Sequence, residues 1–228
     1  MKGTLTGIGV GPGDPKLLTI KALEAIKNSD VVAVPGQVPE DSVAYQIVVQ
    51  VYPQLAQKRL IPVYMPMTKD PKELEENHEK GAEEIAGLLD QGLHVAFLTL
   101  GDPTVYSTYI YIHQRIQKLG YDTEIISGIT SFCAVSARLN MGLVEKAQQL
   151  HVIPASYQIE EALKLPGTKV LMKAGRKMSQ VRNLLKEHPE DVLMIENCGM
   201  PDEHIYEGAD QIPEEAGYYS LIIVKEKI

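Results

Sequence analysis

The feature that most constrains the fold is an alternation of short apolar runs with stretches of helical periodicity, which continues along the whole chain. Apolar runs of strand length lie at residues 5–10, 31–34, 60–64, 95–100, 123–126, 150–153, 169–172 and 192–196. Helices are expected between them, at residues 16–28, 42–51, 71–91, 105–119, 129–139, 159–163 and 179–187. Strands that alternate with helices predict an α/β fold, in which mostly parallel sheets are covered by helices on both faces. An antiparallel pair is expected near the end of the chain, at residues 205–207 and 218–225.

The length of the chain fits two such domains in tandem. The chain has 228 residues, and a domain commonly holds about 100–200 residues. The strand pattern restarts after Gly120, where a helix is expected to end in a glycine C-cap. We therefore expect two α/β/α domains, residues 1–120 and 121–228, with a cleft between them.

Composition and residue spacing exclude several classes of function. The net charge of −8 argues against nucleic-acid binding, because phosphates are bound by clustered Lys and Arg. Cys133 and Cys198 lie far apart, which excludes a disulfide framework or a thiolate zinc site and is typical of a reducing cytosol. The six histidines form no HxxxH or HExxH pair, so no metal site of the protein's own is expected. No signal peptide and no apolar run near about 18 residues is present, so we expect a cytoplasmic protein that does not enter the membrane.

Three turns that contain glycine follow expected strands. They read Gly-Val-Gly-Pro-Gly-Asp at 9–14, Leu-Gly-Asp-Pro-Thr-Val-Tyr at 100–106 and Ser-Gly-Ile-Thr-Ser at 127–131. Glycine lets the backbone approach a ligand closely, and open parallel sheets bind ligands at the carboxyl ends of their strands. We therefore expect these turns to face one crevice. Taken alone, the first turn is equally consistent with a tight connection that binds nothing, and Asp102 with a helix cap.

The first turn does not match two common nucleotide-binding loops. A dinucleotide-binding loop needs GxGxxG and an acidic residue that ends the next strand. Here the spacing is GxGxG with Pro12 inserted, and the second strand ends in Val-Pro-Gly at 34–36. A Walker loop would need GK[ST] after the glycines, which is absent.

In this order and spacing, the turns resemble those of the tetrapyrrole methylase family. The resemblance begins with residues 9–14 and 17–22, and continues with 101–103 and 127–131. It extends through Met-Lys-Ala-Gly-Arg at 172–176, Glu-Asn-Cys at 196–198 and Gly-Tyr-Tyr-Ser at 217–220, and so covers nearly the whole chain. Residues 101–109 and 172–176 and the short length are similar to members that methylate C-20 of precorrin-2 or cobalt-factor II in cobalamin biosynthesis.

The resemblance implies a cofactor, a substrate and an assembly. The methyl donor is expected to be S-adenosylmethionine, with S-adenosylhomocysteine as the product and no metal bound by the protein. The cofactor site is expected between the two domains, with the tetrapyrrole trough on the first, and the protein is expected to be a homodimer. Cofactor contacts are expected from Pro12, Leu100, Gly101, Asp102, Val105, Thr130, Ser131, Ala174, Cys198 and Tyr219. The chain departs from many relatives at Ser127, which replaces a proline, and from some at Cys198, which replaces a glycine.

Methyl transfer of this kind makes few chemical demands on the protein. The sulfonium carries an activated methyl group and the macrocycle supplies a nucleophilic carbon, so alignment alone can contribute about 7–11 kcal/mol. We expect Asp102 to be the catalytic residue, beside the reacting meso carbon, where it orients the substrate or removes its proton.

Two further residues are expected to bind the substrate. Arg176 can grip a carboxylate of the tetrapyrrole with two parallel hydrogen bonds, although an arginine at such a position is more often a solvated surface charge. Tyr106 can pack against the macrocycle, or else within the core. His113 could ligate cobalt in the substrate, but its position two helical turns after Tyr106 argues against this.

Other functions remain open at this point. A different family member could methylate another macrocycle position, a protein or an RNA. A non-enzymatic sensor could bind an adenosyl ligand without turnover. A nicotinamide dehydrogenase is disfavoured by the glycine spacing. The sequence also leaves open whether the substrate contains cobalt.

Overall fold

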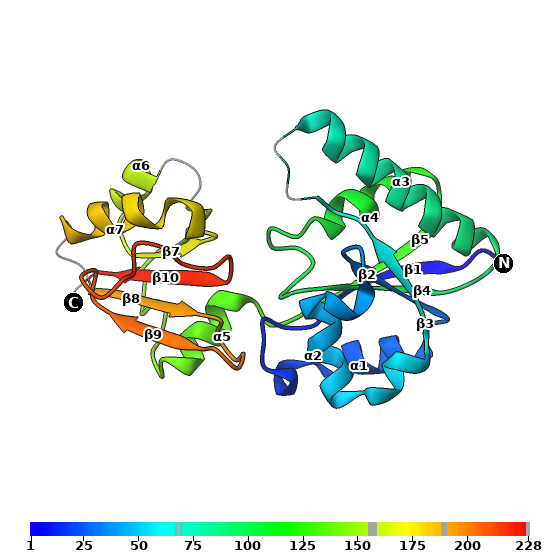
Figure 1. Ribbon diagram of the computed structural model, residues 1–228, viewed down its shortest axis with the longest axis horizontal. Helices are drawn as coiled ribbons and strands as arrows, with labels where there is room; N and C mark the ends of the chain where they lie inside the picture. The colour runs from blue at the N-terminus through cyan, green and yellow to red at the C-terminus, as the bar shows by residue number, and fades with distance from the viewer. Residues whose placement is uncertain (67, 69, 155–158, 188–190, 227–228) are drawn as a thin grey trace. The chain divides into compact units, whose positions relative to one another are not determined.

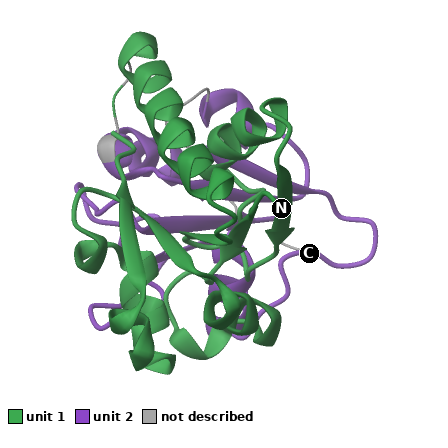
Figure 2. Ribbon diagram, turned by 90° about the vertical axis from the view of Figure 1, so that its right-hand side faces the viewer, with its two compact units in different colours: residues 1–130 green, residues 131–228 purple. Residues whose placement is uncertain are grey.

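The computed structural model consists of two compact units, residues 1–130 and 131–228 (Figures 1 and 2). It describes residues 1–66, 68, 70–154, 159–187 and 191–226. The seam expected at Gly120 lies inside the first unit, because the strand that follows it, β5 (Asp122–Ile126), pairs with β1 (Thr4–Gly9). β5 thus belongs to unit 1 because it pairs with a strand more than a hundred positions earlier in the chain. A local sequence pattern does not reveal such a pairing.

The sheet of unit 1 is parallel throughout. Its strand order is β3-β2-β4-β1-β5, and every neighbouring pair has parallel register. The remaining strands are β2 (Val31–Pro35), β3 (Arg59–Val63) and β4 (Val95–Thr99). Because all strands run the same way, the turns after β1, β4 and β5 leave from one edge of the sheet.

Helices cover both faces of this sheet, as the alternation of apolar runs predicted (Figure 1). The helices are α1 (Ile20–Asn28), α2 (Val43–Val51), α3 (Pro71–Asp90) and α4 (Tyr109–Lys118), with short 3-10 turns η1 (Pro15–Leu17), η2 (Pro39–Asp41) and η3 (Pro53–Gln57). On one face, Val31 and Phe97 pack with Ile85 of α3. On the other, Val32 packs with Ile26 of α1. Side chains of one strand alternate between the two faces.

Two helices of the first unit begin later than expected. The helix predicted from residue 16 is divided, since η1 ends at Leu17 and Thr19 then caps α1, its hydroxyl accepting from the Ala22 amide at 3.1 Å. The helix predicted from residue 105 begins at Tyr109. Residues 102–108 instead form an extended turn, in which Tyr106 has a left-handed backbone.

Unit 2 contains a mixed sheet rather than a mostly parallel one. Its order is β6-β7-β10-β8-β9, with strands β6 (Leu150–Pro154), β7 (Thr168–Met172), β8 (Asp191–Glu196), β9 (His204–Glu207) and β10 (Ser220–Lys225). Only β6 and β7 pair in parallel. The helices are α5 (Ser131–Arg138), α6 (Ile159–Leu163) and α7 (Met178–Lys186), with a 3-10 turn η4 (Gly175–Lys177) before α7. The α/β class is confirmed, and the strand directions of unit 2 correct the expectation of parallel pairing there.

The last two strands do not pair with each other, which corrects the antiparallel pair expected near the end of the chain. β10 inserts between β7 and β8, antiparallel to both, and β9 pairs with β8 at the sheet edge. Burial explains the choice. β10 is buried at every position except its last, whereas β9 is largely exposed. The more apolar strand therefore occupies the centre, where both of its faces are covered.

Two further properties concern the described part of the chain. None of its helices combines the length and the apolar character needed to cross a membrane. Within the same residues, no three His, Cys, Asp or Glu side chains gather in a way that could hold a metal ion.

Candidate functional site

The turns after β1 and β4 are joined by their backbones at the carboxyl edge of the first sheet. The Gly11 amide donates to the Gly101 carbonyl at 3.3 Å, and the Gly101 amide donates to the Gly11 carbonyl at 2.8 Å. Both glycines have a left-handed φ, at +81° and +70°, a conformation that is strained for most other residues. Glycine at these positions therefore permits the pairing of the two turns.

The third turn packs directly onto this pair. The Gly128 amide donates to Oδ2 of Asp102 at 3.0 Å. A Cβ atom on Gly128 would lie 2.1 Å from the Gly101 carbonyl oxygen, and one on Gly9 would lie 2.5 Å from the Gly128 nitrogen. No side chain fits at these contacts. The structure thus brings together the three turns that the sequence singled out, and we refer to residues 9–14, 100–106 and 127–130 as the three-turn cluster.

Asp102 lies at the centre of the cluster and is only 7% exposed. Its Oδ1 accepts hydrogen bonds from the Thr104 amide at 2.8 Å and the Thr104 hydroxyl at 2.5 Å. Its Oδ2 accepts from Gly128. One oxygen of the carboxylate therefore closes a local turn onto Thr104, and the second holds the third turn. The helix cap that the sequence allowed at Asp102 is wrong, because α4 begins only at Tyr109, after Thr108 as its N-cap residue. Thr104 and Gly128 are partners that the sequence did not single out for this role.

The other predicted contacts of unit 1 lie on the same three turns. Pro12 is buried, and Leu100 and Val105 are half-buried. The Thr130 hydroxyl oxygen is buried, with no hydrogen-bond partner among the described residues. Leaving such a group unpaired typically costs about 1–3 kcal/mol, so Thr130 is a position where a bound polar group would be stabilised.

Tyr106 does not pack in the core. It is 47% exposed, and its φ of 50° is unusual for a bulky residue. Hydrogen bonds hold the chain on both sides of it. The Thr104 amide before it donates to Asp102, and the Ser107 hydroxyl after it lies 2.7 Å from the Thr99 hydroxyl and accepts from the Tyr109 amide at 3.3 Å. Strain of this kind typically costs about 1–3 kcal/mol and gathers at functional sites. The core-packing interpretation of Tyr106 is therefore wrong, because close to half of the residue is exposed.

His113, in contrast, belongs to the core of unit 1. Its Nδ1 lies 3.0 Å from the Tyr109 hydroxyl, and burial lowers the pKa of His113. Tyr109 is fully buried against Gly7, where a Cβ atom would lie 2.1 Å from the tyrosine ring. Burial also raises the pKa of the Tyr109 hydroxyl, which therefore stays protonated. This arrangement makes His113 a packing residue.

A second group of segments converges in unit 2. Because β7 and β8 are both antiparallel to β10, the turns after β7 and β8 meet the segment before β10 at one sheet edge. The Asn197 amide donates to the Tyr219 carbonyl at 3.0 Å, and the Gly217 amide donates to Oε1 of Glu196. A Cβ atom on Gly175 would lie 2.7 Å from the Ala216 carbonyl oxygen. We refer to residues 173–176, 196–198 and 216–219 as the unit 2 edge.

Each predicted cofactor contact of unit 2 except Ser131 lies on this edge. Ala174 is fully buried, and Cys198 is half-buried. Tyr219 is partly exposed, and burial with the neighbouring Tyr218 raises the pKa of its hydroxyl. Ser131 instead opens α5. Arg176 lies in η4, and its side chain is outside the described part of the structure.

Backbone strain on the unit 2 edge was not predicted. Lys173 and Asn197 have left-handed φ values of 58° and 54°. Asparagine tolerates this conformation, so Asn197 carried a weak signal, but lysine carries none. The Lys173 ammonium lies 5.7 Å from the centroid of the Tyr218 ring, within the range of a cation–π contact.

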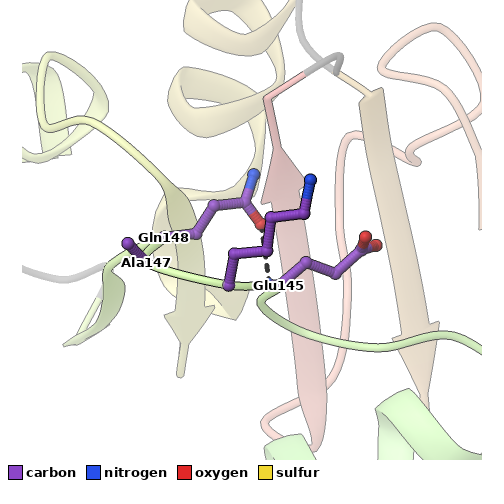
Figure 3. Close-up of a pocket in the computed structure, with 4 residues that line it drawn as sticks. Glu145, Ala147 and Gln148 are labelled. Atoms are coloured by element: carbon purple, nitrogen blue, oxygen red, sulfur yellow. Dashed lines mark hydrogen bonds between the residues drawn. The ribbon is translucent and has the colours of Figure 1, made fainter.

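A hollow elsewhere in unit 2 contains none of the predicted residues. It is lined by Glu145, Lys146, Ala147 and Gln148, from the connection between α5 and β6 (Figure 3). The Glu145 amide donates to Oε1 of Gln148 at 2.9 Å. These four described lining residues are consecutive in the sequence.

Comparison with known proteins finds one matching family model and several relatives that are similar in sequence. The family model of the tetrapyrrole (corrin/porphyrin) methylases matches residues 4–210. A probable cobalt-precorrin-2 C(20)-methyltransferase of Methanocaldococcus jannaschii is 33% identical, over 96% of this chain and 94% of the relative. A precorrin-2 C(20)-methyltransferase of a Sinorhizobium species is 29% identical, over 97% and 95% of the two chains.

A solved structure has the same fold. The uroporphyrin-III C-methyl transferase of Thermus thermophilus, in complex with S-adenyl homocysteine, superposes with a TM-score of 0.70 at 22% identity. The superposition covers 98% of each chain, so both units, and not only the parallel sheet, are shared with it.

Proposed function

The chain belongs to the tetrapyrrole (corrin/porphyrin) methylase family, and on this basis we propose that it methylates C-20 of a tetrapyrrole in cobalamin biosynthesis. The observation that carries the proposal is that both C(20)-methyltransferase relatives align with nearly the entire chain. The substrate is precorrin-2 or its cobalt-containing counterpart, the forms named in those relatives.

S-adenosylmethionine is the methyl donor in this proposal. The three-turn cluster fits it in kind, since the buried Thr130 hydroxyl has no hydrogen-bond partner among the described residues and would be satisfied by a polar group of the cofactor. The residues proposed to contact it are Pro12, Leu100, Gly101, Asp102, Val105, Thr130, Ser131, Ala174, Cys198 and Tyr219. When bound, it supplies a methyl group that its sulfonium has already activated. The cleft expected between the two domains stays a prediction.

The residues of the chain have a limited task in such a reaction. They must bind both reactants, hold them in line and exclude water, which are the contributions that alignment makes in bimolecular reactions. Tyr106, exposed on the three-turn cluster, is proposed to contact the macrocycle. Arg176, whose backbone follows β7, is proposed to bind a substrate carboxylate.

Assembly and location complete the proposal. A homodimer is expected from the family resemblance. A cytoplasmic location is proposed because neither Cys133 nor Cys198 is part of a disulfide.

Turnover under anaerobic conditions tests the proposed function. The protein is incubated with S-adenosylmethionine and either precorrin-2 or its cobalt-containing form, and the product mass is followed over time. A gain of one methyl group by either substrate is expected, and the faster reaction identifies the preferred form. If neither tetrapyrrole gains mass while S-adenosylhomocysteine still binds, the proposed substrate is wrong.

A further inference from the structure

We infer that Asp102, Thr104 and Gly128 form a clamp between two turns, in which Asp102 and Thr104 act as positioning residues for cofactor binding. This inference rests on the proposed function for the identity of the cofactor. It assigns a role to Thr104 and Gly128. For Asp102 it replaces direct cofactor contact and proton removal with an orienting role that acts through Gly128.

The carboxylate of Asp102 is already occupied by donors from the protein. A carboxylate has about four lone-pair positions on its two oxygens. Three of these are used, two by the amide and hydroxyl of Thr104 and one by the amide of Gly128. A group that accepts a proton from substrate needs an oxygen free to reach it. To accept a proton from substrate, Asp102 would have to use Oδ2, which already accepts from the Gly128 amide. The geometry therefore favours a role in which the carboxylate links the two turns.

The clamp fixes the third turn at a place where the backbones of the turns are tightly packed. The Gly128 backbone fills the space beside Gly9 and Gly101, so closely that a Cβ atom at Gly128 would lie 2.1 Å from the Gly101 carbonyl oxygen. Thr130 follows two residues later, with its hydroxyl buried and without a partner among the described residues. A shift of Gly128 would therefore move the hydroxyl that is proposed to contact the cofactor.

Asparagine cannot reproduce this arrangement. If the amide nitrogen of Asp102→Asn takes the place of Oδ2, it faces the Gly128 amide, and both groups are donors. If the nitrogen takes the place of Oδ1, the Thr104 hydroxyl can turn to accept from it, but the Thr104 amide remains an opposed donor. Either orientation loses at least one hydrogen bond of the clamp, although the side-chain shape is unchanged.

Binding of S-adenosylhomocysteine by calorimetry, with a kcat and KM measurement, tests the inference. Asp102→Asn is expected to raise the Kd at least about tenfold, the loss typical of a charge-assisted hydrogen bond, and to raise the KM for S-adenosylmethionine in parallel. At saturating cofactor its kcat should fall less than about tenfold. Thr104→Val, which removes only the hydroxyl donor, should raise the Kd about three- to tenfold, while Thr104→Ser restores it to within about twofold of wild type.

A matched control separates the clamp from simple capping. Asp70 also accepts from the amide two residues ahead, that of Lys72 at 2.9 Å, where it caps α3 far along the chain from the cluster. Asp70→Asn keeps a side-chain oxygen that can accept from the Lys72 amide, so it should leave both the melting temperature and the Kd nearly unchanged. Hydrogen exchange of the Gly128 amide gives a second readout, since Asp102→Asn should accelerate it and Asp70→Asn should not.

Each outcome decides between the clamp and its alternatives. If Asp102→Asn binds S-adenosylhomocysteine as wild type does while kcat falls about 10²–10⁴-fold, the residue is a proton acceptor and the clamp is wrong. Wild-type protein that binds S-adenosylhomocysteine but methylates neither tetrapyrrole would refute the proposed function alone, because the binding data on the variants still test the clamp. Wild-type protein that does not bind S-adenosylhomocysteine would overturn both.

Discussion

Tyr106 illustrates how a single residue can be held in an unfavourable conformation by its neighbours. The Asp102–Thr104 hydrogen bonds precede it and the Ser107–Thr99 contact follows it. Its left-handed backbone is therefore imposed by anchored segments on both sides. The position of the partly exposed side chain is therefore set by this backbone conformation, and not by packing of the ring in the core.

This arrangement predicts a selective effect of Tyr106→Asn. Asparagine tolerates the left-handed backbone, so the turn and the melting temperature should be preserved. Loss of the aromatic contact should raise the KM for the tetrapyrrole about three- to tenfold, with the Kd for S-adenosylhomocysteine unchanged. Steady-state kinetics with calorimetry measure both quantities. An unchanged tetrapyrrole KM would exclude Tyr106 from the substrate site.

His113 predicts a pH dependence of stability. Burial lowers the pKa of His113 in the folded protein, while in the unfolded chain it titrates near its ordinary value of 6.5. Both states carry a neutral imidazole well above that pH. As the pH falls through about 6.5, the unfolded chain takes up the proton first, so the free energy of unfolding decreases.

Replacement of His113 by glutamine removes this contribution. Urea denaturation of wild type at pH 7.5 and 5.5 should show a loss of stability at the lower pH, and His113→Gln should lose less over the same interval. His78, whose pKa is also lowered, first by burial and then by Arg115, stays in both proteins and contributes equally. Equal losses in the two proteins would show that His113 is not held neutral by the fold.

At the scale of elements, strand order in unit 2 is set by burial. β10 lies at the centre of the sheet and β9 at its edge, although they are successive strands in the chain. Ile222 of β10 is fully buried, whereas Ile205 of β9 is 38% exposed. Because both residues are isoleucine, they allow the central and the edge strand to be compared with identical side chains.

Truncation of each isoleucine to alanine tests this order. Ile222→Ala should lower the free energy of unfolding by about 2–5 kcal/mol, because it leaves a cavity in the sheet core. Ile205→Ala should cost less than about 1 kcal/mol, as expected of a partly exposed residue. Chemical denaturation followed by circular dichroism measures both. Similar losses would indicate that β9 and β10 do not occupy the centre and the edge as described.

The positions of strands and helices could be predicted from the sequence better than the pairing of the strands. Strand positions followed from apolar runs, and the convergence of the three turns followed from their place after parallel strands. The assignment of β5 to unit 1 and of β10 to the centre of unit 2 depends on pairing across long stretches of chain. Local periodicity does not contain that information.

Within the candidate site, the predictable part was the set of glycines and the Asp102 carboxylate. Glycine at positions 9, 11, 101 and 128 indicates close backbone approach, whatever the partner. Thr104 carried no comparable signal, because a threonine after an aspartate is common in turns. The left-handed backbone of Tyr106 and Lys173 could also not be predicted from the sequence, since neither residue type favours this conformation.

At the scale of the whole molecule, a single polypeptide combines two units with different sheet architectures. Unit 1 is a parallel sheet that carries the three-turn cluster, and unit 2 is a mixed sheet that carries a second set of converging segments. Relatives that match over nearly the full length include both units. The account therefore predicts one reaction, C-20 methylation, that depends on residues from each.

The position of the transferred methyl group tests that claim most directly. Wild-type protein is incubated anaerobically with tetrapyrrole and S-adenosylmethionine labelled with ¹³C in its methyl group, and the product is examined by NMR. A single labelled methyl on C-20 is expected. A labelled methyl at any other carbon would contradict it, leaving family membership intact but assigning the chain to a different methylation of the macrocycle.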